Sequence, residues 1–193
     1  MLASESQAKA LIFSNNVGTL REMFASNQDR WRQFVAALSA DTQLLLSHPP
    51  IASSWLPLSQ HVEVITTAHD VLFERDIKGA FELGRQSTLR SMRSVYRFFI
   101  RVASPNHVIG RSTQMWDTFF RGNGAVQTNL LAPQLLQVQF RGITLPSEPF
   151  WEVQRGGFVA LAELTRVQDV RTRYVGQTQP DDSTRVIEMS WSR

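Results

Sequence analysis

The chain has 193 residues, of which 42% are hydrophobic and 19% are charged. This balance is typical of a folded globular domain with a core of its own, and it argues against a disordered chain. The sequence contains no cysteine, which excludes disulfides, thiolate metal sites and a cysteine nucleophile. The net charge of +3 is too small to indicate nucleic-acid binding by itself.

The first residues, MLASESQAKALIF, lack the basic start and the long apolar core of a secretory signal. No apolar run approaches the ~20 residues that span a bilayer. We therefore expect a cytoplasmic protein without a membrane span.

The N-terminal third is predicted to consist of short helices. Ser4 or Ser6 is expected to cap the first, and residues 17–24 are expected to form a second. Asp29 and Asp41 are suitable N-caps for two more helices.

Prolines interrupt the helical pattern in residues 47–57, SHPPIASSWLP, and predict an extended or turned segment there. This segment is the best linker candidate, and two arrangements remain open. It separates a helical part, residues 1–48, from a main body, residues 58–193, or it joins two helices of one bundle. In either case we expect a single domain.

Residues 58–73 have a helical pattern, and residues 77–102 predict the longest continuous helix, which we expect to be central to the fold. One face is apolar and contains Gly84, where the missing side chain lets another backbone approach closely. That face consists of Ile77, Phe81, Gly84, Thr88, Met92, Val95, Phe99 and Val102. The opposite face carries Arg90, Arg93, Arg97 and Arg101, and Arg85 lies on the flank of the apolar face.

A further helix is predicted to start at Pro105, which suits a first helical position. It is expected to end at Gly122, because glycine readily adopts the left-handed conformation past a helix end. Trp116 and Phe119 fall on its apolar face.

After Gly124 the pattern changes from helical to extended. Apolar and polar residues alternate with a period of two, which predicts half-buried antiparallel strands, and a shift at Gly142 predicts a bulge or bend. The expected order is β-β-α-β-β over residues 124–132, 135–145, 150–167, 167–177 and 183–191. Helices segregated from a small antiparallel sheet indicate an α+β fold.

The late helix contains the pair Gly156 and Gly157. Two glycines lower helix stability by roughly 1–2 kcal/mol. We therefore expect a close helix–helix or helix–sheet contact that offsets this cost.

Three short motifs resemble a family of uncharacterised paralogues best known from myxobacteria. They are FELGR at 81–85, RGGF at 155–158 and the apolar last strand ending at Trp191, and the resemblance covers residues 58–191. That family is similar in shape to small-molecule sensor domains, namely the vinyl-reductase-type domain and, more remotely, the haem-nitric-oxide-binding fold. The resemblance implies a sensory or protein-interaction role and assigns no functional residue.

Haem sensors of that fold use a helical histidine and a Tyr-x-Ser-x-Arg clamp for the haem propionates. His69 and His107 fall in predicted helices, but neither Tyr96 nor Tyr174 begins such a clamp. We therefore expect no haem, and no other cofactor is predicted.

No catalytic or metal-binding motif is present. The four histidines lack the spacings that place two imidazoles on one helical face, and there is no Gly-x-Ser-x-Gly elbow. The glycine clusters at 122–124 and 156–157 lack the setting and the lysine of a phosphate-binding loop. The sequence predicts neither a catalytic residue nor a metal site.

The first candidate binding surface is the arginine face, formed by Arg85, Arg90, Arg93, Arg97 and Arg101. Guanidinium groups in a row repel one another unless acidic groups lie opposite. Those groups belong to the domain itself, to an acidic protein partner, or to a nucleic acid or nucleotide. An intramolecular or solvated role is the favoured interpretation.

The second candidate is a group of aromatic residues that could line an apolar pocket between the late helices and the sheet. The alternative, and the more common arrangement, is that these residues form the core. The group consists of Trp116, Phe119, Phe120, Phe150, Trp151 and Phe158.

These observations favour a non-enzymatic sensor or adaptor that acts through contacts with a protein partner. A homodimer and a small apolar ligand are further candidates. Nucleic-acid or nucleotide binding through the arginine face is the alternative function, and an enzyme of unrecognised type is the third.

Overall fold

The computed structural model describes residues 5–92, 105–176 and 179–192. Helices occupy the N-terminal half, and an antiparallel sheet with one long helix follows. The predicted α+β class is therefore confirmed.

The chain begins with a short strand, β1 (Gln7–Lys9), which leads directly into α1 (Ala10–Met23). The separate helix expected over residues 17–24 is wrong, because α1 runs through this stretch without a break. Its buried residues recur at helical spacing along the whole helix; they are Ala10, Phe13, Asn16, Val17, Thr19 and Leu20.

Two short helices follow, α2 (Gln28–Ala37) and α3 (Ala40–Ser47). Asn27 and Ser39 are their N-caps, and each side chain accepts a hydrogen bond from a backbone N–H of the first turn. The aspartates predicted as caps, Asp29 and Asp41, lie two residues farther along, where a negative charge is favourable in the first turn.

The proline-rich segment at residues 47–57 contains strand β2 (Trp55–Pro57). This strand pairs with β1, which also pairs with β3 (Phe120–Arg121). The segment is extended as predicted, but it joins a three-stranded sheet together with residues from distant parts of the sequence. Pairing between strands of two or three residues leaves no periodic signal in the sequence.

The predicted helix over residues 58–73 is present as α4 (Leu58–Thr67) followed by a π-helix, η1 (Ala68–Leu72). Next comes α5 (Ile77–Ser91). Residues 93–104, and with them the rest of the predicted central helix, lie outside the described residues.

The buried face of α5 is rotated from the predicted apolar face. Gly84 is buried as expected, whereas Ile77, Phe81 and Thr88 are only partly buried. The residues buried on α5 are instead Ala80, Leu83, Gly84 and Ser87, and all of these except Leu83 are small.

The single helix predicted from Pro105 is divided at Arg111 into α7 (Pro105–Gly110) and α8 (Ser112–Phe119). It also ends earlier than expected, because Phe120 is extended and belongs to β3. Gly122 follows with a φ of 64°, the left-handed conformation that the sequence predicted there.

The C-terminal half confirms the β-β-α-β-β order. Strands β4 (Ala125–Ala132) and β5 (Leu135–Arg141) precede α9 (Glu148–Glu163), and β6 (Gln168–Tyr174) and β7 (Arg185–Ser192) follow it. All neighbours are antiparallel, in the spatial order β4-β5-β7-β6. The inward residues of the two central strands are Leu136, Val138, Phe140, Ile187, Met189 and Trp191.

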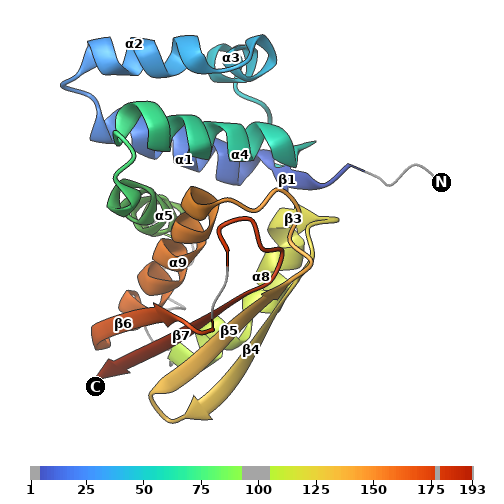
Figure 1. Ribbon diagram of the computed structural model, residues 1–193, viewed down its shortest axis with the longest axis vertical. Helices are drawn as coiled ribbons and strands as arrows, with labels where there is room; N and C mark the ends of the chain where they lie inside the picture. Colours follow the sequence, from blue (N-terminus) through green and yellow to red (C-terminus); the bar gives the residue numbers. More distant parts are fainter. Residues whose placement is uncertain (1–4, 93–104, 177–178, 193) are drawn as a thin grey trace.

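Figure 1 shows α2 and α3 stacked on α1 and α4, with α5 and α9 between these helices and the four-stranded sheet. Helices α5 and α9 cross in backbone contact. A Cβ atom at Gly84 would lie 2.0 Å from the carbonyl oxygen of Val153, and one at Gly156 would lie 2.0 Å from that of Phe81. The close helix–helix contact expected at the glycine pair is therefore present, and it requires glycine on both helices.

We predict that Gly84→Ala lowers the free energy of unfolding by about 3 kcal/mol, since the added methyl group must separate two packed backbones. Urea denaturation followed by circular dichroism measures this. Gly110→Ala is the matched control, because a Cβ there meets no atom within 4 Å, and we expect no loss. Equal stability of the two variants would contradict the proposed constraint.

Candidate functional site

A partly open cavity of about 150 Å³ lies where α1, α4, α5, α8 and α9 converge. Most of the side chains around it are apolar, and they come from both the N-terminal and the C-terminal half of the sequence. The large apolar members are Leu11, Ile12, Met92, Trp116, Phe119, Phe120, Phe158 and Leu161.

The space exists because small residues face it from α5 and α9. Gly84, Ser87 and Ser91 border it on α5, and Gly157 borders it on α9. The glycines that let the two helices approach thus also leave room beside the crossing. A Cβ at Gly157 would already lie 3.1 Å from the hydroxyl of Thr88.

His61 of α4 is a buried polar member of the wall, with 2% of its surface exposed. Its Nδ1 atom has no hydrogen-bond partner among the described residues, and its ring meets the ring of Phe120 edge to face at 6.2 Å. Burial lowers the pKa of His61 to about 4. The imidazole is therefore neutral at pH 7.

Asn16 of α1 is a second buried polar member, with 4% of its surface exposed. The neighbouring Asn15 also borders the cavity, and its amide donates to the hydroxyl of Ser91 at 2.6 Å. Ser91 in turn donates to the carbonyl oxygen of Ser87 at 2.8 Å. The polar side of the cavity wall is thus formed by α1 and α4 facing the serines of α5.

The structure divides the predicted aromatic group between the cavity and the core. Trp116, Phe119 and Phe120 line the cavity together with Phe158. Trp116 stacks on Phe120 with ring centroids 4.1 Å apart, and its indole N–H donates to the carbonyl oxygen of Asn123 at 3.0 Å.

Trp151, in contrast, does not line this cavity. It is fully buried against Phe140 and Phe150, and its indole N–H donates to the carbonyl oxygen of Pro180 at 3.2 Å. Trp151 and Phe158 lie two turns apart on the same face of α9, and both rings contact Phe140. Only Phe158, nearer the end of α9, also borders the cavity.

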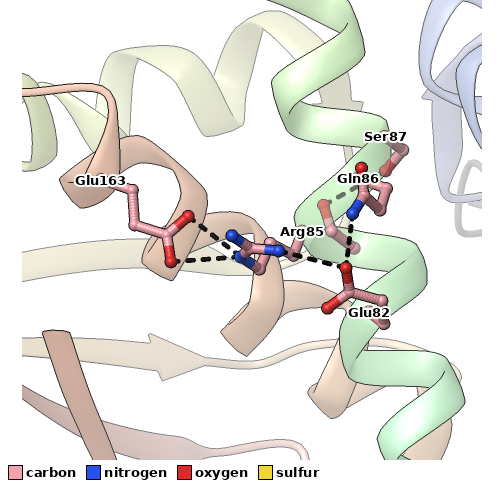
Figure 2. Close-up of polar contacts among 6 residues, drawn as sticks. Glu82, Arg85, Gln86, Ser87 and Glu163 are labelled. Atoms are coloured by element: carbon pink, nitrogen blue, oxygen red, sulfur yellow. Dashed lines mark hydrogen bonds and ion pairs between the residues drawn. The ribbon is translucent and has the colours of Figure 1, made fainter. Parts of the chain in front are cut away.

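The described arginines of the predicted arginine face pair with carboxylates of the chain itself. Arg85 Nε donates to both carboxylate oxygens of Glu163 at 3.1 and 2.9 Å, and Nη1 donates to Glu82 at 3.1 Å. Figure 2 shows this clamp between α5 and α9. Partial burial lowers the pKa of Arg85, but the two glutamates outweigh this effect and raise the pKa overall.

Arg90 forms an ion pair with Glu22 of α1. Arg93, Arg97 and Arg101 lie outside the described residues, so a binding role for the arginine face stays a prediction. The two members that the structure describes match the intramolecular interpretation.

A buried charged cluster that the sequence analysis did not anticipate joins α9 to β6. Arg155 Nε donates to both oxygens of Glu152 at 3.1 and 3.0 Å, and the hydroxyl of Tyr174 donates to Glu152 at 2.7 Å. Burial, and then the charge of Glu152, raise the pKa of Tyr174 above its usual range. The spacing of Glu152 and Arg155, three residues apart on one helix, was the available signal.

His61 was also missed as a site residue, although the sequence contains a signal for it. It lies three residues after Leu58 and four before Ile65, and these share the buried face of α4.

Among the described residues, no group of His, Asp and Glu could hold a metal ion. None of the described helices is long and apolar enough to cross a membrane.

Protonation of His61 provides a test of its burial. The unfolded imidazole takes up a proton near pH 6.5, whereas the folded one does so only near pH 4. The unfolded state therefore binds more protons in this interval, and stability falls with decreasing pH. Relative to His61→Phe, we predict that the parent loses roughly 3 kcal/mol of unfolding free energy from pH 6.5 to 4.

Urea denaturation at several pH values measures this difference. Both proteins have the same carboxylates, so the carboxylates' contribution to the pH dependence cancels. The control is His48→Phe at an exposed position, whose stability should parallel that of the parent. Parallel curves for the parent and His61→Phe would show that His61 is not held neutral.

Solved structures of H-NOX domains match almost the whole chain. For a mutant of the H-NOX protein from K. algicida, in the Fe(II) unliganded state, the TM-score is 0.69 at 7% identity, over 96% of this chain and 97% of that one. For an oxygen-binding H-NOX domain related to soluble guanylate cyclases, the TM-score is 0.65 at 9% identity, over 96% and 95%.

A mutant of the T. tengcongensis H-NOX gives a TM-score of 0.64 at 9% identity, over 96% of this chain and 98% of that one. The sequence matches no protein-family model and none of the curated proteins. Identity this low shows the fold alone, and the chain adopts the H-NOX fold.

Proposed function

We propose that the chain is a sensor domain that binds a small uncharged molecule in the cavity and signals to a protein partner, without chemistry on the ligand. The fold supports a small-ligand sensor, since H-NOX domains include one described as binding oxygen. The cavity supports the proposed place at which this molecule binds.

The observation that carries the proposal is that helices from both halves of the chain line one cavity. Helices α1 and α4 contribute one part of the wall, and α5, α8 and α9 contribute the other. A ligand there contacts both groups of helices and stabilises the arrangement in which they enclose it. Occupancy is thereby coupled to the position of α1 relative to α5, which a partner protein can recognise.

The residues around the cavity do not fit haem, the group named for a further similar structure, from a study of heme redox potential and porphyrin distortion. A volume of about 150 Å³ is below the ~300–1,000 Å³ of pockets that hold larger ligands. No arginine or lysine is among the described lining residues, so none of these residues offers a charged partner to the two haem carboxylates. The crossing at Gly84 and Gly156 also closes the space between α5 and α9.

The histidines expected on helices do not alter this conclusion. Neither His69 nor His107 is among the described residues that line the cavity. We therefore propose that the ligand is a molecule smaller than haem.

We predict that toluene, at ten times its dissociation constant, raises the Tm of the parent by about 3–5 °C, because binding to the folded state adds about 1.4 kcal/mol. Leu11→Trp should abolish this shift, since Leu11 lines the cavity and is 38% exposed, so it lies at the mouth. Calorimetric titration measures the affinity itself.

The matched control is Leu44→Trp on α3, which is 58% exposed and outside the cavity. It should bind toluene as the parent does. Equal binding by the Leu11 variant would exclude the cavity as the site, and no binding by the parent would exclude the proposed ligand class.

We further predict that protein from cells supplied with a haem precursor has no Soret band and gains no haem-sized mass in native mass spectrometry. A domain of haem-binding type, expressed in the same cells, serves as the positive control. A stoichiometric Soret band that survives gel filtration would overturn the assignment of a smaller ligand.

A further inference from the structure

The four-stranded sheet has two edge strands of different character, and Figure 1 shows β4 at one side and β6 at the other. An edge strand presents backbone N–H and C=O groups to other chains, and proteins commonly protect such edges with charges, prolines or bulges. Strand β6 has this protection: it carries Asp169, Arg171 and Arg173, and its register shifts between Gln168 and Arg171. Strand β4 carries neither a charged residue nor a proline.

The end of β4 is open to solvent. Among the described residues, β4 pairs only with β5. All of its last four residues are exposed, and they include Leu130 at 56% and Leu131 at 49%. Helix α8 approaches the sheet from its inner face, where Trp116 contacts the buried ring of Phe140. Because successive exposed residues point to opposite faces, the backbone edge between these faces is open as well.

The side chains of β4 follow a symmetric pattern around Thr128. Val126, Thr128 and Leu130 pair with the inward residues of β5. Gln127 and Asn129 pair with glutamines on the solvent side of β5. An amide thus lies on each side of Thr128, and an aliphatic residue lies beyond each amide. The register shift of β4 comes after Leu130, outside these five residues.

A strand with this pattern is complementary to a second copy of itself. In an antiparallel pair about a two-fold axis at Thr128, Gln127 of each copy lies opposite Asn129 of the other. Val126 of each copy lies opposite Leu130 of the other. Amides then face amides on the solvent side and aliphatic groups face each other on the core side, where Leu130 becomes covered.

The other edge of the sheet lacks this complementarity. An axis at Thr172 would place Arg171 of each copy opposite Arg173 of the other, and like charges directly opposite are destabilising. Asp169 also has a φ of 50°, which interrupts the extended backbone of β6. Charge and backbone conformation thus oppose self-pairing at β6 and permit it at β4.

We propose that the chain forms a homodimer in which two copies of β4 pair antiparallel about a two-fold axis at Thr128 and join the two sheets into one. The uncharged, symmetric strand specifies a second copy as the occupant of this edge. The inference rests on the edge strand and is independent of the proposed ligand site.

Sedimentation equilibrium of the full chain in the micromolar range should show a reversible monomer–dimer equilibrium. In the double variant Gln127→Lys and Asn129→Lys, ammonium groups lie opposite each other on both sides of the axis. The dissociation constant of the dimer should therefore rise about tenfold. Both positions are exposed on the solvent side of the sheet, so we expect circular dichroism to show an unchanged monomer fold.

The matched control is the double variant Gln127→Lys and Asn129→Glu, which changes the same two positions but places opposite charges across the axis. Its dimer should be at least as stable as that of the parent, since each charged pair is then attractive. The comparison tests the register, because only an axis at Thr128 places these two positions opposite each other.

A single cysteine provides a measurement that does not depend on charge or on the fold of the lysine variant. The sequence contains no cysteine, so Thr128→Cys places one thiol of each copy next to the axis. Residues directly opposite in an antiparallel pair are close enough for a disulfide. Under a mild oxidant this variant should form a linked dimer faster than Leu44→Cys, whose thiol lies at an exposed position of α3.

Three results would overturn the proposal. A parent that sediments only as a monomer excludes a second copy and leaves the edge of β4 to a strand of another protein. A double-lysine variant that dimerises as tightly as the parent, or equal oxidation rates of the two cysteine variants, places the dimer contact elsewhere. If the Lys and Glu variant is weakened as much as the double-lysine variant, the axis at Thr128 is wrong.

Discussion

The crossing of α5 and α9 is the contact on which the rest of the structure depends. Gly84 and Gly156 bring the two backbones so close that a methyl group on either helix would overlap a carbonyl oxygen of the other. Arg85 then joins the helices through Glu163 beside the crossing. On its far side α9 covers the sheet, and α5 carries the N-terminal helices, so one pair of glycines sets the distance between both parts of the fold (Figure 1).

The cavity is a consequence of the same choice of small residues. A helix face that must accommodate a neighbouring backbone carries glycine and serine, and beyond the crossing these residues leave space that large side chains would fill. Aromatic residues of α8 and α9 close part of it, and His61 of α4 belongs to the same wall. Packing and the shape of the cavity are therefore linked at α5, and a substitution that tightens the core there also alters the cavity.

Charge has a mainly internal role in the described part of the molecule. Arg85 and Arg90 bind glutamates on α9 and α1, and Arg155 binds Glu152 next to Tyr174. Each pair connects a helix to another element or orients a side chain toward one. Arginine suits this use, because a guanidinium group donates several hydrogen bonds in fixed directions.

The amino-acid sequence alone determined the α+β class, the β-β-α-β-β order with the approximate positions of its five elements, and the need for a close contact at Gly156 and Gly157. These features follow from periodicity and local backbone preference. The three short paired strands and the division between Trp116 and Trp151 were decided only by tertiary structure. So was the unsatisfied nitrogen of His61. The spacing along α4 indicates a buried face, but whether the nitrogen finds a partner depends on which distant segments pack there.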